Sequence, residues 1–88
     1  MSNVLHVNSS EFKDVIANNE LVFVDFYANW CGPCKMLAPS VEKLADEHSG
    51  VKVIKVDVDQ ENQLAMEFQV QSIPTLIVFK NGQPVNPN

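Results

Sequence analysis

The feature that most constrains this chain is the run Leu21-Val22-Phe23-Val24-Asp25-Phe26-Tyr27, in which only Asp25 is charged. β-Branched and aromatic residues dominate it, and these residue types are typical of strands. A strand with one face in water alternates apolar and polar residues, whereas this run is apolar on both faces. The run therefore predicts a central strand that is covered on both sides.

Three segments around this strand have the apolar spacing of helices. The first begins after Asn8, which forms a capping-box pattern with Glu11, and it ends near Asn19. The second ends at about His48, and Pro39 within it predicts a kink. The third is short. Their apolar stripes are, in order, Phe12, Val15 and Ile16; Leu37, Val41, Leu44 and Ala45; and Leu64, Ala65 and Phe68.

Three more segments have strand patterns, namely residues 4–7, 51–58 and 75–79. The alternation of strands and helices favours an α/β sheet with right-handed crossovers. Asn81-Gly82 then predicts a tight type I′ hairpin turn. Only a short tail follows, and its residues Pro84 and Pro87 cannot donate to a strand ladder. We therefore expect the fold to stop at this turn.

The composition limits the kinds of partner. The 88 residues, 45% of them hydrophobic, fit one small domain over residues 1–88. A net charge of -5 argues against nucleic acid, because phosphate binding needs clustered Lys and Arg. No segment approaches the roughly 18 apolar residues of a membrane span, and the start from Met1 to His6 lacks the pattern of a secretory signal. We expect a cytoplasmic protein that does not associate with membranes.

Cys31 and Cys34 are the only cysteines, and they stand at the predicted start of the second helix. Their spacing allows a small disulfide ring, and in a reducing compartment such a pair is catalytic or metal-binding more often than structural. The helix N-terminus stabilises a thiolate at Cys31, which we expect to be exposed and to attack, while Cys34 lies deeper and resolves the mixed disulfide. Gly32 lets a substrate backbone approach, and Pro33 fits a first helical turn because its N–H is not needed there.

A C-x-x-C pair is also half of a zinc site, so metal binding is the main alternative. The remaining candidates, His6 and His48, are isolated in the sequence and are expected on the surface, so no mononuclear metal site is predicted. A purely structural disulfide is disfavoured because so short a ring constrains the unfolded chain little. A binding module that holds a metal or iron-sulfur cluster between two chains through Cys31 and Cys34 stays open, as does an inactive fragment.

Asp25 interrupts the apolar strand shortly before the cysteines. Its carboxyl should lose water on folding, and desolvation raises the pKa of a carboxyl group. Such a group can take the proton from Cys34 when that thiol becomes the second nucleophile. The alternative is a buried carboxyl that is satisfied by a structural hydrogen bond. Lys55, on the adjacent predicted strand, either modulates Asp25 or stays in water.

Three separate segments, taken together, resemble the thioredoxin family. They are residues 24–35 around the cysteines, Ser72-Ile73-Pro74-Thr75, and Phe79-Lys80-Asn81-Gly82. The resemblance implies a thioredoxin-like fold, with a central mixed sheet flanked by helices. It also implies a thiol-disulfide oxidoreductase that reduces protein disulfides without a bound cofactor, and that is recharged by a thioredoxin reductase drawing on NADPH.

The resemblance assigns roles to single residues of the redox centre. Cys31 would be the nucleophile, Cys34 the resolving thiol and Asp25 the buried acid-base group. Lys55 matches the lysine that lies near the buried aspartate. Tyr27 stands where relatives often have another aromatic residue.

The resemblance also implies a substrate side and a missing end. Pro74 matches the family's cis-proline, which faces the cysteines, and the backbone of Ile73 would pair with an extended substrate beside Trp30. The family continues after the turn with an edge strand, a loop and an amphipathic helix, which this sequence lacks. We therefore expect a C-terminally truncated fold with an exposed edge along residues 75–79, and self-association as a way to cover that edge.

Overall fold

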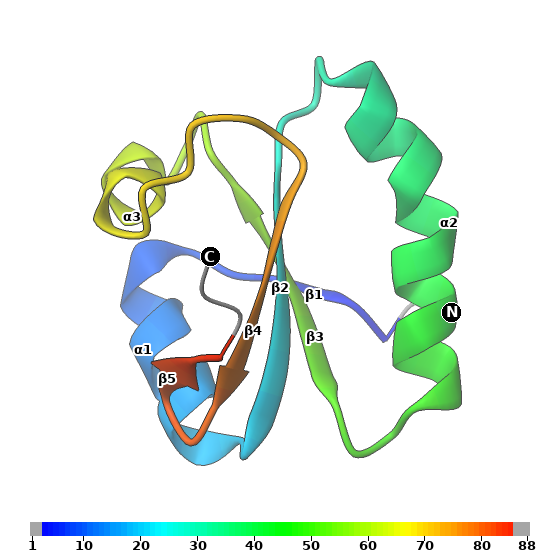
Figure 1. Cartoon of the computed structure of the whole chain (residues 1–88), viewed down its shortest axis with the longest axis vertical. Coiled ribbons are helices and arrows are strands. Elements are labelled where there is room, and N and C mark those ends of the chain that lie inside the picture. The colour runs from blue at the N-terminus through cyan, green and yellow to red at the C-terminus, as the bar shows by residue number, and fades with distance from the viewer. Residues whose placement is uncertain (1–2, 86–88) are drawn as a thin grey trace.

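The computed structural model describes residues 3–85. The prediction made for Pro87, and the part of the N-terminal prediction that concerns the first two residues, therefore fall outside the described residues. Strands and helices alternate through most of the chain, as the apolar patterns predicted (Figure 1). The elements are β1 (Leu5–His6), α1 (Ser9–Asn18), β2 (Leu21–Tyr27), α2 (Gly32–Glu47), β3 (Lys52–Asp57), α3 (Asn62–Glu67), β4 (Thr75–Lys80) and β5 (Gln83–Pro84).

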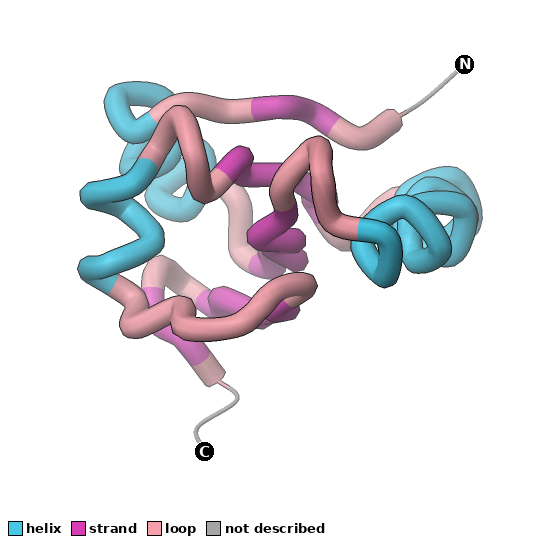
Figure 2. The backbone as a smooth tube through the Cα atoms, turned by 90° about the horizontal axis from the view of Figure 1, so that it is seen from above, coloured by secondary structure: helices cyan, strands magenta, loops and turns pink. Residues whose placement is uncertain are grey.

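The five strands form one mixed sheet in the order β1-β3-β2-β4-β5. β2 pairs in parallel with β3 and antiparallel with β4, so it has a neighbour on each side. α2 lies on one face of the sheet, and α1 and α3 lie on the other (Figures 1 and 2). The apolar run of β2 therefore forms a central strand covered on both faces, which confirms the prediction.

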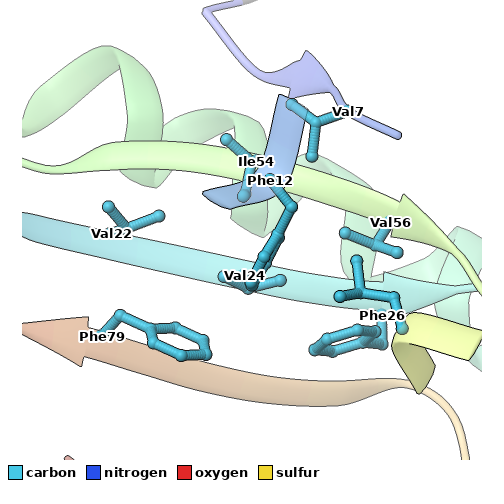
Figure 3. Packing of buried hydrophobic residues seen from close by; sticks show 9 residues of the cluster. Val7, Phe12, Val22, Val24, Phe26, Ile54, Val56 and Phe79 are labelled. Atoms are coloured by element: carbon cyan, nitrogen blue, oxygen red, sulfur yellow. The ribbon is translucent and has the colours of Figure 1, made fainter. Parts of the chain in front are cut away.

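The larger core cluster lies between the sheet and α1 with α3. Val22, Val24 and Phe26 of β2 point into it and are fully buried (Figure 3). Phe12 of α1 meets Phe79 of β4 edge to face, with 5.6 Å between the ring centroids. Burying side chains of this size contributes about 1.5–3 kcal/mol each. This packing holds β2 in place, and with it the residues of its opposite face.

Local signals fixed the ends of several elements. The capping box of α1 is present, because Asn8 Oδ1 accepts from the Glu11 N–H and Glu11 Oε1 accepts from the Asn8 N–H. α2 continues as one helix through Pro39.

None of the helices in the described range has both the length and the apolar character needed to cross a membrane.

The chain does not stop at its turn, contrary to the expectation from its prolines. Asn81 and Gly82 have positive φ angles of 52° and 84°, as the predicted type I′ turn requires. β5 then returns along β4, with Pro84 opposite Phe79, and the Val85 N–H donates to the Val78 carbonyl at 2.8 Å. Successive antiparallel pairs alternate between hydrogen-bonded and non-hydrogen-bonded positions, so Pro84 sits where no N–H is needed.

The sequence predicted an exposed edge along residues 75–79, and β5 covers its end by pairing with Phe79 and Lys80. The expected loss of the last strand is therefore corrected to a short strand of two residues, Gln83–Pro84. Self-association through this side of the sheet stays a prediction.

Candidate active site

The two cysteines form a disulfide at the start of α2. Cys31 is the N-cap of this helix, and Cys34 lies in its first turn with a Cα–Cα distance of 5.2 Å between them. The backbone N–H of Cys34 donates to Cys31 Sγ at 3.1 Å. Pro33 occupies the first helical turn, where its missing N–H has no cost. The predicted position of both sulfurs at one helix N-terminus is confirmed.

Cys31 is not exposed in the disulfide form, contrary to expectation. Both cysteines are only 4% exposed. The pair packs against Ala28, with Val58 and Ile73 beside it, and Cys31 Sγ lies 3.9 Å from the Ile73 carbonyl oxygen. These neighbours cover both sulfurs once they are joined. The two cysteines differ instead in the cavities that they line.

Cys31 lines an open groove of about 410 Å³. Trp30 stands at its rim, 70% exposed, and its Nε1 donates to Asp59 Oδ2 at 2.8 Å. A Cβ added to Gly32 would meet nothing within 4 Å, so the backbone here faces open space. The Ile73–Pro74 peptide bond is cis, as the resemblance implied. The groove is lined by Trp30, Cys31, Gly32, Pro33, Val58, Val70, Gln71, Ser72 and Ile73.

Cys34 lines a separate, smaller cavity of about 100 Å³, together with Tyr27 and Lys55. Asp25, paired in register with Lys55, is fully buried on the same side of the sheet. Burial raises the pKa of the Asp25 carboxyl, and the positive charge of Lys55 opposes this by lowering it. The expected direction of the pKa shift is confirmed.

The alternative of a structural hydrogen bond to Asp25 finds no support in residues 3–85. Neither carboxyl oxygen has a hydrogen-bond partner among them. A buried polar group without such a partner is costly to stability, and groups of this kind cluster at functional sites. Asp25 therefore has the environment of a proton-exchanging group.

Residues 3–88 match the protein family described as Thioredoxin. This chain belongs to the thioredoxin family. A thioredoxin of Haemophilus influenzae is 48% identical over 87 residues, which are 97% of this chain and 81% of that protein. A bifunctional thioredoxin reductase/thioredoxin of Mycobacterium leprae is 53% identical over 79 residues, which are 89% of this chain and 17% of that protein.

The fold agrees with solved thioredoxin structures. A thioredoxin variant from Halobacterium salinarum NRC-1 superposes with a TM-score of 0.90 at 44% identity, covering 94% of this chain and 74% of that one. The resemblance found in the motifs is thus confirmed over most of the chain. The protein is a thiol-disulfide oxidoreductase acting on protein disulfides, and its redox centre is the pair Cys31 and Cys34.

Metal binding is not favoured as an alternative, because the family match and the Cys31–Cys34 disulfide support thioredoxin chemistry. The residues from 3 to 85 contain no group of three or more His, Cys, Asp or Glu side chains placed to hold a metal ion. His6 and His48 are exposed, as predicted. An inactive fragment is not favoured either, given the family match and the intact cysteine pair.

Two contacts of this thioredoxin site were missed by reasoning from sequence. Asp59 was not singled out, although it follows the end of β3, and the carboxyl ends of neighbouring parallel strands meet at one edge of a sheet. That placement was the available signal for its bond to Trp30. His6 was set aside as isolated, yet its Nδ1 lies 3.1 Å from Tyr27 Oη. Only the strand order brings these two residues together.

Proposed function

We propose that this chain reduces protein disulfides with Cys31 as the attacking thiol and Cys34 as the resolving thiol. The observation that carries the proposal is the difference between the two cavities. Cys31 lines a groove of about 410 Å³, whereas Cys34 lines one of about 100 Å³ beside Lys55. A substrate chain fits against the first sulfur and not against the second, so each cysteine has its own task.

The first step is attack on the substrate. The Cys31 thiolate, supported by the helix N-terminus and the Cys34 N–H, attacks one sulfur of the substrate disulfide. The substrate S–S bond breaks, a bond forms between Cys31 and the attacked sulfur, and the other substrate sulfur leaves as a thiolate that takes up a proton. The product is a mixed disulfide.

The second step is resolution. The Cys34 thiol gives its proton to Asp25, directly or through water, and the resulting thiolate attacks Cys31 Sγ. The mixed disulfide breaks, the Cys31–Cys34 bond forms, and the second substrate sulfur leaves as a thiolate and is protonated. Two electrons have then passed from the chain to the substrate. Burial supports this role, because a raised pKa makes the Asp25 carboxylate a better proton acceptor.

The groove is the proposed substrate site. An extended substrate segment lies along Trp30 and pairs with the backbone of Ile73, next to Pro74. The open space above Gly32 supports this placement, since a substrate backbone can come close there. Pro33 stiffens the turn between the sulfurs. The contacts are mainly to backbone and to an apolar rim, so many substrate sequences fit.

The oxidised chain needs an electron donor. We propose a thioredoxin reductase that draws on NADPH, and the bifunctional thioredoxin reductase/thioredoxin of Mycobacterium leprae, which matches most of this chain, supports that pairing. The chain itself binds no cofactor, because the cysteine pair carries the electrons. We further propose that it works as a single domain over residues 1–88 in the reducing cytoplasm, where the cysteines are returned to thiols.

A coupled assay tests this function. The oxidised chain is mixed with NADPH, a thioredoxin reductase and a disulfide-containing protein, and consumption of NADPH is followed by absorbance. Reduction of the oxidised chain itself consumes one equivalent of NADPH, so we expect continued consumption beyond that equivalent only when all four components are present, and none in a Cys31→Ser variant. Continued NADPH consumption without the disulfide protein, or none beyond the first equivalent when it is present, contradicts the proposal.

A further inference from the structure

A polar row crosses the sheet behind the disulfide. The strand register pairs His6 of β1 with Lys55 of β3, and Lys55 with Asp25 of β2. Tyr27 follows Asp25 by two residues in the same strand, so its side chain points to the same face. Three neighbouring strands therefore bring four polar side chains to one end of the face that packs against α2.

Direct contacts link three members of this row, namely His6, Tyr27 and Lys55. Lys55 Nζ lies 4.4 Å from the centroid of the Tyr27 ring, within the range of a cation-π interaction. Tyr27 Oη and His6 Nδ1 are 3.1 Å apart and share a hydrogen bond. The two rings also meet edge to face, with their centroids 5.8 Å apart. The Tyr27 ring is thus held by His6 and in turn holds the Lys55 ammonium.

We propose that Tyr27, held by His6, is a positioning residue that keeps the Lys55 ammonium beside Asp25 and so sets the pH at which Asp25 takes the Cys34 proton. The inference rests on the proposed function, because it deepens the role given there to Asp25.

The need for positioning follows from the nature of a lysine side chain. Its charged head sits on four flexible methylene groups and ordinarily extends into water. Lys55 is half-buried, and its position over the Tyr27 ring keeps the charge on the side of the sheet where Asp25 lies. That charge lowers the pKa of Asp25 against the stronger, raising effect of burial. Release of Lys55 from the ring therefore raises the pKa of Asp25 further.

Tyr27 suits this role because it stays neutral. Burial raises the pKa of its phenol, and the negative charges of Asp57 and Asp25 raise it as well. Its ring therefore offers an uncharged face to Lys55 over the whole range in which a carboxyl titrates. Over that range the charge of Asp25 changes, while the Tyr27 ring, which acts as a clamp on Lys55, stays uncharged.

Other groups near Asp25 have to be counted in any titration. On β4 its register partner is Leu76, which is apolar. The cavity of about 100 Å³ brings together Tyr27 of β2, Lys55 of β3, and Cys34 and Lys35 of α2. A second, outer cavity of about 320 Å³ is also lined by Tyr27 and Lys55, and its other titratable groups are His6, Glu11, Asp57 and Glu61. The cysteines do not titrate in the disulfide form. The oxidised protein is therefore the cleaner form in which to follow Asp25.

The test is a carbon NMR titration of the Asp25 carboxyl in the oxidised protein. Tyr27→Leu should move the titration midpoint upward by about half a pH unit, the scale of one cation-π contact. Tyr27→Phe keeps the ring and loses only the bond to His6, so its upward shift should be smaller. In a Lys55→Gln background, Tyr27→Leu should cause no further upward shift.

Several results would overturn the inference. One is an equal shift by Tyr27→Leu with and without Lys55, since Tyr27 would then act without the ammonium. Another is a downward shift of the Asp25 titration midpoint in Tyr27→Leu. Water that reaches the carboxylate would then lower its pKa by more than the displaced Lys55 charge raises it. No shift in Tyr27→Leu also overturns it. If Tyr27→Leu fails to fold, Tyr27→Phe decides: an upward shift that is absent in the Lys55→Gln background supports the clamp, and no shift rejects it.

A rate measurement separates this inference from the proposed function. The pH profile of thiol release from a mixed disulfide on Cys31 is recorded for the wild type, Asp25→Asn and Tyr27→Leu. An Asp25→Asn profile identical to the wild type would reject the proposed proton role of Asp25. If Asp25→Asn alters the profile and Tyr27→Leu moves neither the profile nor the NMR midpoint, only the clamp is rejected.

Discussion

Cys31 and Cys34 are three residues apart but face two different environments. The side of the disulfide with the Cys31 groove is called the front, and the side with the Cys34 cavity is called the back. The groove in front of Cys31 is large and open, and the described residues that line it include no Asp, Glu, His, Lys or Arg. The cavity behind Cys34 is about 100 Å³, against about 410 Å³ in front, and Tyr27 and Lys55 line it. The fully buried Asp25 is paired in register with Lys55. We propose on this basis that contact with substrate and transfer of protons take place on opposite sides of the disulfide ring.

This difference has a functional consequence. The attack step needs room and an apolar surface, whereas the resolving step needs a base next to a thiol that substrate does not reach. Substitutions at the back should therefore slow the resolving step and leave the rate of the attack step unchanged. Substitutions in front should slow the attack step and leave the rate of the resolving step unchanged.

The largest effect outside the cysteines is expected at the back, in Asp25→Asn. Loss of a general base costs about 10²-fold or more, so thiol release from a mixed disulfide on Cys31 should slow by about 10²-fold at neutral pH. Rapid mixing with absorbance detection measures this release. Formation of the mixed disulfide, measured in a Cys34→Ser background, should stay within about twofold.

Asp14→Asn is the matched control, because Asp14 is an exposed carboxylate on α1, across the sheet from Cys34. It should leave both steps unchanged. A slowed attack step in Asp25→Asn would break the division between front and back.

Asp25→Asn should also stabilise the fold at neutral pH. Burial raises the pKa of Asp25 above its ordinary value of 3.8, so the folded state keeps a proton that the unfolded chain has lost. Stability therefore falls as pH rises from about 3.8 through the folded-state pKa, and each pH unit between the two costs about 1.4 kcal/mol.

Urea unfolding of oxidised wild type and Asp25→Asn at several pH values checks this dependence. The variant should be the more stable at pH 7, and the difference in stability should narrow as the pH falls from the folded-state pKa of Asp25 toward 4. A gap that is independent of pH would mean that the Asp25 charge does not cause it.

A smaller effect is expected in front, from Trp30→Ala. The indole is the largest apolar side chain at the groove rim, and truncating such a side chain typically costs more than 1 kcal/mol of binding. The kcat/KM for a protein disulfide should fall about tenfold, with resolution unchanged. Met36→Ala is the control, because Met36 is 83% exposed on α2 but does not line the groove. An equal loss in both variants would contradict a specific role for the groove.

The smallest effect is expected from Asp59→Asn. This change replaces the charge-assisted bond from Trp30 Nε1 with a neutral one, which weakens the hold on the indole without removing it. We expect a loss of about two- to threefold in kcat/KM and no change in thiol release. Steady-state kinetics and the mixed-disulfide assay measure the two quantities. A slowed release would show that Asp59 also acts at the back.

The sequence predicts the scaffold well because its signals are local. The apolar run of β2, the Asn8 capping box and the Asn81-Gly82 turn each depend on a few adjacent residues, and the structure has all three. Asp25 was also found from sequence, because a charge within an otherwise apolar central strand is conspicuous. Its burial and the direction of its pKa shift followed from that position alone.

The remaining features depend on contacts between distant residues. Pro84 was expected to end the fold, but its position in the ladder, fixed by the turn, needs no N–H. Cys31 was expected to be exposed, but Ile73, far along the chain, helps to cover it. The contact between His6 and Tyr27 exists only because β3 lies between β1 and β2. Local patterns carry no information on strand order.

The separate tasks of the two cysteines can be tested by mapping a trapped adduct. Cys34→Ser and Cys31→Ser variants are each reduced, mixed with a disulfide-containing protein and quenched with acid, and the modified cysteine is identified by peptide mass spectrometry. We expect rapid accumulation of a mixed disulfide on Cys31 in the first variant and little adduct in the second. An adduct on Cys34 that forms at a comparable rate in the Cys31→Ser variant would contradict the division of roles between front and back.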